Sequence, residues 1–170
     1  KQLLQQIPLE IRYLWDIYCG IGTIGISLAQ PGQTVIGIEI VAEAVESAQE
    51  NSRQNQVAAA YFTGLAEEVL PVLTKKTMPI SSEKVGQSLP ASLWREDCFS
   101  AGVAILDPPR QGCDEKVLTA CAAAGFPYLI YISCHSASFA RDAKYLGTLG
   151  YQVQSVQPVD LFPQTGHVET

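Results

Sequence analysis

Apolar and polar positions alternate along this chain in two distinct ways. Short apolar runs that favour β-strands occur at Tyr13–Tyr18, Thr34–Glu39, Ala59–Thr63, Val103–Asp107 and Tyr128–Ser133. Between them, apolar residues recur at helical spacing, at Ile24 and Leu28 and then across Val41–Asn55, Glu67–Leu73, Glu115–Ala123 and Ser136–Leu149. Strands that alternate with helices are joined by right-handed crossovers, and nearly continuous apolar strands are typical of buried parallel sheets. The pattern therefore predicts an α/β fold with a mostly parallel sheet and helices on both faces.

Two segments interrupt this alternation. Residues 74–99 mix Pro, Ser, Gly and charged residues, which predicts a long surface loop with a short helix. A further strand is predicted at Gln152–Val159, and the ending D-L-F-P-Q-T-G-H-V-E-T then stops where another strand would begin. We therefore expect residues 1–170 to form one domain that belongs to a longer protein.

The composition indicates a globular chain without a membrane-spanning segment. Of the 170 residues, 47% are hydrophobic and 16% are charged, which is ordinary for a domain that buries one core. No apolar run approaches the roughly 20 residues that cross a bilayer, and the first residues lack the layout of a signal peptide. Five cysteines without a C-x-x-C pair argue against a disulfide framework or a zinc site and fit a reducing, cytoplasmic setting.

The net charge of −6 bears on the class of partner. Affinity for nucleic acid usually comes from Lys and Arg side chains that neutralise phosphates. Either the substrate is not a nucleic acid, or other parts of a longer protein supply the basic surface.

A glycine-rich turn follows the first predicted strand. Residues 19–25 read C-G-I-G-T-I-G, and the next strand ends in Glu39. Glycine lets the backbone turn sharply and approach a ligand, and a carboxylate about 20 residues further on suits the hydroxyls of a ribose. A dinucleotide and S-adenosylmethionine both fit this pattern. The alternative without a ligand is a tight turn beside a solvated acid.

The fourth predicted strand runs into Asp107-Pro108-Pro109-Arg110. Two prolines hold the residue before them in extended geometry and make a rigid rim at the carboxyl edge of the sheet. Ligands of open α/β sheets bind at this edge. A dehydrogenase does not need this segment, whereas many methyltransferases place an Asp- or Asn-Pro-Pro segment between the cofactor and the base that is methylated. A turn stiffened by proline, without chemistry, is the alternative.

Two further residues are candidates for catalysis. Cys134 follows the fifth predicted strand and precedes a helix, where the helix dipole favours a thiolate. Glu169 lies in the segment F-P-Q-T-G-H-V-E near the end of the chain. Each residue alone has an ordinary alternative, a buried cysteine and a surface acid, and Cys19, Cys98, Cys113 and Cys121 are interpreted as ordinary buried cysteines.

The chain resembles the RNA 5-methyluridine methyltransferase family, which modifies tRNA or large-subunit rRNA. The segments that carry the resemblance occur in the family's order and cover nearly the whole chain: D-I-Y-C-G-I-G-T-I-G, G-I-E, L-D-P-P-R-Q-G, Y-I-S-C-H, A-R-D and D-L-F-P-Q-T-G-H-V-E. The resemblance implies a Rossmann-like fold that uses S-adenosylmethionine and no metal. Residues 1–170 would then be the catalytic domain of such an enzyme, acting as a monomer.

The resemblance also assigns roles to individual residues. Cys134 is the nucleophile that adds to carbon 6 of uracil, and Glu169 is the base that removes the proton from carbon 5. Glu39 binds the cofactor ribose, and Asp107 lies between the cofactor and the target base. The glycine turn supplies the other cofactor contacts, at Tyr18, Gly20 and Gly22.

The chain departs from the family pattern in two respects. His135 stands where the family usually has Asn, which puts the local contacts of that residue in doubt. The family's cofactor-contacting glutamine segment, and its RNA-binding and sometimes iron–sulfur regions, would precede Lys1. Their absence accounts for the acidic charge. The T-G-H-V-E ending slightly favours rRNA over tRNA as the substrate.

Three other interpretations remain open from the sequence. A methyltransferase that acts on an exocyclic nitrogen, a small molecule or a protein would not need Cys134 as a nucleophile. A nucleotide-binding oxidoreductase domain would use the glycine turn for NAD. A binding module without catalysis would need neither Cys134 nor Glu169.

Overall fold

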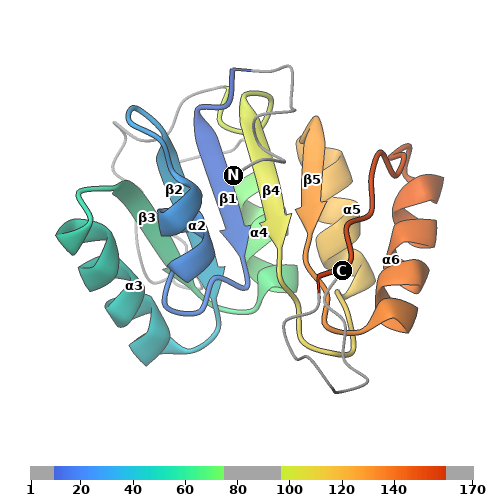
Figure 1. Ribbon diagram of the computed structural model, residues 1–170, viewed down its shortest axis with the longest axis horizontal. Coiled ribbons are helices and arrows are strands. Elements are labelled where there is room, and N and C mark those ends of the chain that lie inside the picture. Colours follow the sequence, from blue (N-terminus) through green and yellow to red (C-terminus); the bar gives the residue numbers. More distant parts are fainter. Residues whose placement is uncertain (1–9, 75–96, 160–170) are drawn as a thin grey trace.

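The computed structural model describes residues 10–74 and 97–159, which form a parallel sheet between two layers of helices (Figure 1). The described strands are β1 (Tyr13–Ile17), β2 (Thr34–Glu39), β3 (Ala58–Thr63), β4 (Gly102–Leu106) and β5 (Tyr128–Tyr131). Their order is β3-β2-β1-β4-β5, and every neighbouring pair is parallel. All carboxyl ends therefore lie at one edge of the sheet, the lower edge in Figure 1.

The chain starts in the middle of the sheet and reverses its direction of travel once. It moves from β1 outward to β3 and then returns to the other side of β1 with β4. Such a reversal is the topological switch point of an open α/β sheet, and ligands bind there in the crevice beyond the carboxyl ends of the strands. The fold thus predicts a site between the segments that follow β1 and β4.

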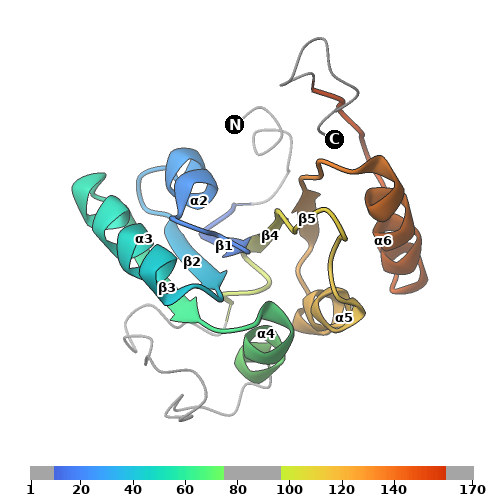
Figure 2. The ribbon, with the colours of Figure 1, turned by 90° about the horizontal axis from the view of Figure 1, so that it is seen from below.

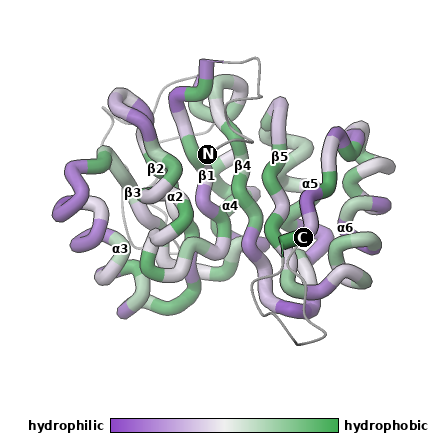
Figure 3. Tube along the Cα trace, viewed as in Figure 1, coloured by the Kyte–Doolittle hydropathy of each residue, from purple (hydrophilic) through white to green (hydrophobic). Residues whose placement is uncertain are grey.

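Helices cover both faces of the sheet, as the alternation of apolar segments predicts (Figure 2). α2 (Thr23–Leu28) and α3 (Ala42–Gln54) lie on one face, and α4 (Ala66–Thr74) and α5 (Glu115–Ala124) lie on the other, with α6 (Ser136–Thr148) beside α5. Successive residues of a strand point to opposite faces, so Trp15 and Ile17 pack in the core with α4 and α5 while Leu14 packs with α3. Hydrophilic stretches lie on the outer turns of α3 and α6 (Figure 3).

The predicted strands are confirmed, but three of them run too far at the carboxyl end. β1 stops at Ile17 because Tyr18 adopts a left-handed backbone with φ 69°. β4 stops at Leu106 and β5 at Tyr131, although their apolar runs continue to Asp107 and Ser133. At each of these positions the chain leaves the sheet to form the edge where the site is expected.

The prediction of a strand at Gln152–Val159 is wrong. These residues are irregular, apart from an isolated bridge at Val159, and all of them are exposed. Val153 and Val156, for example, are 59% and 51% exposed. An extended segment gains stability only when its backbone groups pair with a neighbouring strand. β5 is the outermost strand of the described sheet, and its residues are only half-buried. Most of the predicted loop at residues 74–99 lies outside the described residues.

No helix in the described ranges combines the length and the apolar character that a membrane crossing requires.

Candidate cofactor and catalytic site at the carboxyl edge of the sheet

The glycine turn leaves β1 and leads into α2. Gly22 has φ 81° and precedes the first residue of α2, and its N–H donates to the Cys19 carbonyl oxygen at 2.8 Å. A Cβ atom at Gly22 would lie 2.9 Å from the Tyr61 hydroxyl, so both the backbone angle and the packing require glycine here. Tyr18, at φ 69°, holds a conformation that costs an aromatic residue on the order of 1–3 kcal/mol.

Glu39 lies at the end of β2 and faces this turn. Its Oε2 accepts a hydrogen bond from the Gly20 N–H at 3.0 Å, and its Oε1 accepts one from the Val41 N–H at 2.9 Å. A carboxylate has about four lone-pair positions, so both oxygens retain capacity for a further donor. Tyr18, Gly20, Gly22 and Glu39, four of the predicted cofactor residues, are therefore brought to one place.

A small hollow lies beside Glu39 between the ends of β2 and β3. The residues that line it are Tyr18, Ile38, Glu39, Ile40, Gly64, Leu65, Ala66 and Glu67. Ile40 and Leu65 are 57% and 39% exposed. Apolar side chains around a few polar groups are typical of a small-molecule site. The sequence prediction missed Ile40 and Leu65, and the signal for them was an apolar residue within two positions of a strand end, where a polar loop residue is usual.

A buried carboxylate in β1 accepts a hydrogen bond from the last residue of the glycine turn. Asp16 is fully buried in β1, and its Oδ2 accepts a hydrogen bond from the Gly25 N–H at 2.7 Å. Desolvation by burial raises the pKa of Asp16 to about 6, although the Gly25 hydrogen bond lowers it, and the nearby Asp107 carboxylate adds a smaller upward effect. Asp16 lies in β1 and Asp107 follows β4, so this interaction shows that the segment after β4 lies close to the turn after β1. The sequence prediction did not identify Asp16.

Asp107 follows β4 at the switch point of the sheet. Its N–H donates to the Ile17 carbonyl oxygen, the last of β1, at 3.4 Å. Asp107 is half-buried, Pro108 is buried, and Pro109 and Arg110 are exposed. Asp107 therefore lies next to the glycine turn, as the rim of prolines predicted.

Cys134 lies in the turn between β5 and α6. All five cysteines are in the described part of the chain, and Cys134 is the one that is not buried. Burial raises the pKa of Cys113 to about 12 and also raises the pKa values of Cys19 and Cys121. The interpretation of the other cysteines as ordinary buried ones is thus confirmed, and Cys134 differs from them.

Backbone pairing brings the turn with Cys134 next to Asp107. The Ile132 N–H donates to the Leu106 carbonyl oxygen at 2.8 Å, which extends the pairing of β4 with β5 to the residue directly before Asp107. Both segments then leave the sheet at the same edge. The order along this edge, from β2 to β5, is Glu39, the glycine turn, Asp107 and Cys134.

His135 has a structural role at the start of α6. Its Nδ1 accepts a hydrogen bond from the Ser138 N–H at 3.3 Å, which caps the helix. The Ser133 hydroxyl donates to the His135 carbonyl oxygen at 3.0 Å and accepts from the His135 N–H at 3.1 Å. Asn is a common residue at this capping position, so His135 supplies an acceptor equivalent to the one that Asn would provide.

The predicted base, Glu169, lies outside the described residues, as does the rest of F-P-Q-T-G-H-V-E. Its position relative to Cys134 stays a prediction.

The strand order, the glycine turn after the central strand and the acid after its neighbour are those of Rossmann-like domains, a class in which nucleotides bind at this edge of the sheet. Solved structures refine this class to the methyltransferase fold. The Pyrococcus abyssi tRNA (uracil-54, C5)-methyltransferase, in complex with S-adenosyl-L-homocysteine, superposes with a TM-score of 0.69 at 26% identity, over 99% of this chain and 36% of that one. Precorrin-6y C5,15-methyltransferase from Geobacter metallireducens shares the fold, with a TM-score of 0.62 at 14% identity, over 92% of this chain and 71% of that one.

The chain belongs to the tRNA (uracil-5-)-methyltransferase family, whose model matches residues 6–170. It is 39% identical over 158 residues to an uncharacterized RNA methyltransferase of Clostridium acetobutylicum, covering 92% of this chain and 30% of that protein. A Bacillus cereus relative with the same description is 40% identical over 155 residues, covering 91% and 29%. The chain thus spans about 30% of the length of these relatives. The resemblance to the RNA 5-methyluridine methyltransferases is confirmed, and the oxidoreductase alternative is excluded.

Proposed function

We propose that this chain is the catalytic domain of a longer enzyme that transfers a methyl group from S-adenosylmethionine to carbon 5 of a uridine in RNA. The observation that carries the proposal is the position of Cys134. It is the one cysteine that is not buried, and its turn starts beside Asp107 at the switch point, in a family named for uracil-5 methylation.

The residues around Glu39 fit the adenosine part of the cofactor. The hollow has apolar walls at Ile38, Ile40 and Leu65 with the Glu39 carboxylate at its margin, which suits a flat apolar base joined to a ribose with two hydroxyl donors. The glycine turn leaves room for a ligand to approach the backbone at Gly20, where an added Cβ atom would meet nothing within 4 Å. When bound, S-adenosylmethionine supplies the electrophilic methyl group.

Cys134 provides the activation that uracil needs. Carbon 5 of uracil is a poor nucleophile, and addition of the Cys134 thiolate to carbon 6 forms a C–S bond and moves the electron pair of the double bond to carbon 5. Asp107, on the neighbouring strand end, lies between the cofactor residues and Cys134 and so borders the space for the base. Holding the reacting groups close and aligned is the main contribution of such an edge.

Glu169 completes the reaction in this proposal. After carbon 5 has gained a methyl group it still carries its proton. A base removes that proton, the double bond re-forms, and the C–S bond breaks to return the thiolate. General-base help of this kind contributes roughly 10²–10⁴-fold to the rate.

The substrate base has to leave the RNA stack to reach this edge. We propose that parts of the longer protein beyond this chain bind the RNA, because the chain carries a net charge of −6 and phosphate binding needs positive charge. The substrate is rRNA or tRNA, and mapping the 5-methyluridine that is lost from the RNA of a deletion strain identifies it.

The test uses the full-length protein with RNA that contains 5-fluorouridine. Fluorine replaces the proton that the base must remove, so the wild-type enzyme is expected to stay attached to the RNA and to give a slower band on a denaturing gel. Cys134→Ala should give no band and no product. Cys98→Ala, a change at a buried cysteine before β4, is the matched control and should behave as the wild type. Glu169→Gln should accumulate a methylated adduct on normal RNA. Absence of the wild-type band, or a band with Cys134→Ala, contradicts the proposal.

A further inference from the structure

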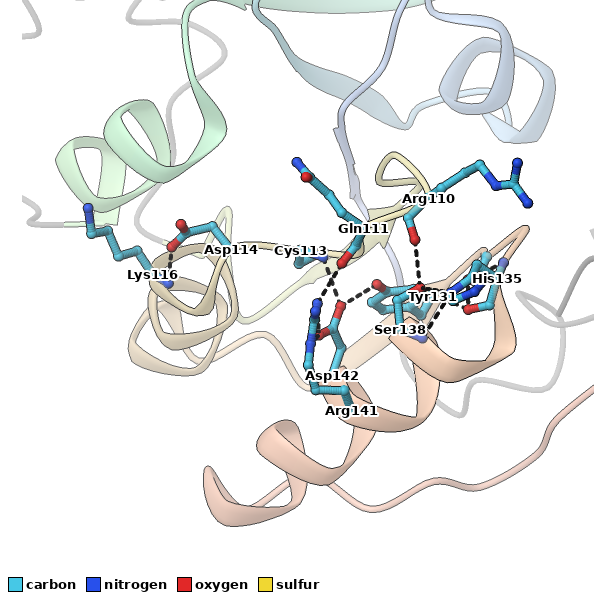
Figure 4. A network of polar contacts seen from close by, with 11 residues as sticks. Arg110, Gln111, Cys113, Asp114, Lys116, Tyr131, His135, Ser138, Arg141 and Asp142 are labelled. Carbon is cyan, nitrogen blue, oxygen red and sulfur yellow. Dashed lines mark hydrogen bonds and ion pairs between the residues drawn. The ribbon is translucent and has the colours of Figure 1, made fainter.

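A second buried carboxylate, Asp142 in α6, lies close to this edge (Figure 4). Asp142 is 2% exposed. Its Oδ2 accepts hydrogen bonds from the Cys113 N–H at 2.8 Å and from the Tyr131 hydroxyl at 2.5 Å. Its Oδ1 accepts from Arg141 Nε at 2.8 Å and pairs with Arg141 Nη2 at 2.7 Å. A buried carboxylate is tolerated when it is paired and hydrogen-bonded in this way, and removal of its partners is costly.

The contacts of α6 extend to the backbone that follows Asp107. Arg141 Nη2 donates to the Gln111 carbonyl oxygen at 2.8 Å, and the Ser138 hydroxyl donates to the Arg110 carbonyl oxygen at 3.0 Å. Ser138, Arg141 and Asp142 are three and four residues apart, so they lie on one face of the helix. One face of α6 therefore holds the backbone of residues 110, 111 and 113.

Gly112 shows how closely this segment and α6 fit. Its φ is 86°, and a Cβ atom there would collide with Asp142 Oδ2 and Arg141 Nη2. The segment thus lies directly against the carboxylate and the guanidinium, with no space for another side chain.

The same helix also holds the turn of the proposed nucleophile. The first turn of α6 is capped by His135, the neighbour of Cys134. The Ser138 Oγ lies 2.9 Å from the His135 carbonyl oxygen, so its single hydrogen is shared between this oxygen and the Arg110 carbonyl oxygen. Ser138 is buried. α6 is therefore in contact with the segment of Asp107 on one side and with the turn of Cys134 on the other.

We infer that Asp142, with Arg141, is a positioning residue for the reaction: it fastens residues 110–113 to α6 and thereby sets the place of Asp107 and Arg110 relative to Cys134. The inference rests on the proposed function, because Cys134 is the reacting group in it. Asp142 touches neither the hollow beside Glu39 nor any atom of Cys134 through a hydrogen bond between described residues, so its effect reaches the reaction through the segment that it holds.

A contact between Tyr131 and Cys113 extends the network toward the cofactor end. Cys113 belongs to the buried core against which Tyr131 and Tyr18, the residue before the glycine turn, both pack. Tyr131 also packs edge-on against Phe139 of α6, with ring centroids 5.5 Å apart. The segment after β4 is thus held between α6 and the turn after β1.

The test separates cofactor binding from covalent chemistry in the full-length protein. Asp142→Asn weakens the hold on residues 111–113. The amide replaces one carboxylate oxygen with an NH2 group, which is a donor and cannot accept the hydrogen bonds of Arg141 or Cys113. Arg141→Gln removes the tie to the Gln111 carbonyl on a side chain that is 58% exposed, so it keeps the fold if Asp142→Asn does not. Asp114→Asn, an exposed acid that caps α5, is the matched control, since Asn caps helices equally well. Glu39→Ala serves as the positive control for loss of cofactor binding.

Three quantities are measured for each variant: the melting temperature, the affinity for S-adenosylhomocysteine by calorimetry, and the single-turnover rate of adduct formation with 5-fluorouridine RNA. We expect Asp142→Asn to slow adduct formation by roughly 10- to 100-fold, the order of loss that a displacement near 1 Å causes. Its affinity for S-adenosylhomocysteine should fall much less than this rate, since the residues that line the hollow beside Glu39, apart from Tyr18, lie in segments that Asp142 does not contact. Arg141→Gln should slow the rate in the same direction by a smaller factor, and Asp114→Asn should not slow it.

Each result has one meaning. If Asp142→Asn and Arg141→Gln form the adduct at the wild-type rate, the inference is overturned. The same holds if rate, cofactor affinity and melting temperature fall in parallel, which would show a general role in stability. If the wild type itself forms no adduct, the proposed function fails instead, and the two failures are distinguished.

Discussion

Two buried aspartates differ in how many donors surround them. Asp142 accepts hydrogen bonds from Cys113, Tyr131 and Arg141, whereas Asp16 accepts one from the Gly25 N–H, and its Oδ1 has no hydrogen-bond partner among the described residues. Burial without enough donors disfavours the ionised form of a carboxyl group. This is why the pKa of Asp16 is raised to about 6.

The raised pKa of Asp16 predicts a specific dependence of stability on pH. Below about pH 4 the carboxyl is protonated in both the folded and the unfolded chain, and above about pH 6 it is ionised in both. Between these values the unfolded chain binds fewer protons than the folded one, so the free energy of unfolding falls as the pH rises, by roughly 3 kcal/mol for a shift of about two pKa units. Asp16→Asn removes this contribution.

Chemical denaturation of the wild type and of Asp16→Asn at pH 4 and pH 7 measures the effect. The stability of the variant relative to the wild type should increase between the two pH values by an amount on the order of 3 kcal/mol. A difference between the two proteins that is the same at both pH values would show that Asp16 is not the group that titrates.

At the scale of the element, α6 begins where the proposed nucleophile lies, so the cap of this helix and the turn of Cys134 are one structure. His135 caps the helix through Nδ1, and the Ser133 hydroxyl holds the His135 backbone. The doubt that the family pattern raised about this position is resolved by geometry, because an imidazole nitrogen and an amide oxygen both serve as acceptors for the Ser138 N–H.

Variants of His135 test this explanation. His135→Asn should leave the free energy of unfolding nearly unchanged, because the capping acceptor is kept. His135→Ala should lower it by about 1 kcal/mol, the usual cost of losing a capping side chain. Urea denaturation of the two variants measures both values. Equal stability of the Asn and Ala variants would mean that the cap contributes nothing.

At the scale of the whole molecule, the charge of −6 opposes the class of substrate that the family implies. The proposed site lies at the carboxyl ends of β2, β1, β4 and β5. Affinity for RNA at this edge would depend on positively charged side chains close to it. The chain spans about 30% of the length of the Clostridium acetobutylicum relative, which is why we propose that other parts of a longer protein bind the RNA.

The isolated chain is therefore expected to bind RNA poorly near the physiological salt concentration of about 150 mM. Binding of an acidic protein neutralises few phosphates, so it releases few counterions from the RNA. Filter binding of a uridine-containing RNA at two salt concentrations measures both the affinity and its dependence on salt. The full-length protein, measured alongside, should bind more tightly and with a steeper dependence. Tight binding by the isolated chain would show that a local basic groove outweighs the net charge.

The succession of strands and helices along the chain was predictable from local patterns, because periodicities of two and 3.6 residues report which faces of an element are buried. The glycine turn and Glu39 were also predictable, since a strand that ends in glycines and an acid at the next strand end lie at the same edge of a parallel sheet. The carboxyl ends of the strands were not predictable. β1, for example, ends where Tyr18 adopts a strained backbone conformation that only the surrounding structure maintains.

Only the tertiary structure determined the contacts between residues that are far apart in the sequence. It placed Asp142 against Cys113 and Gly112, 29 and 30 positions away, although the spacing of Phe139, Asp142 and Leu146 already puts an acid on the buried face of α6. It also left Cys134 as the one cysteine that is not buried and left Gln152–Val159 without a strand. A local pattern specifies whether a residue is suited to the interior, but only the packed chain determines which groups meet it there, because a buried polar group is stable only beside partners that distant segments supply.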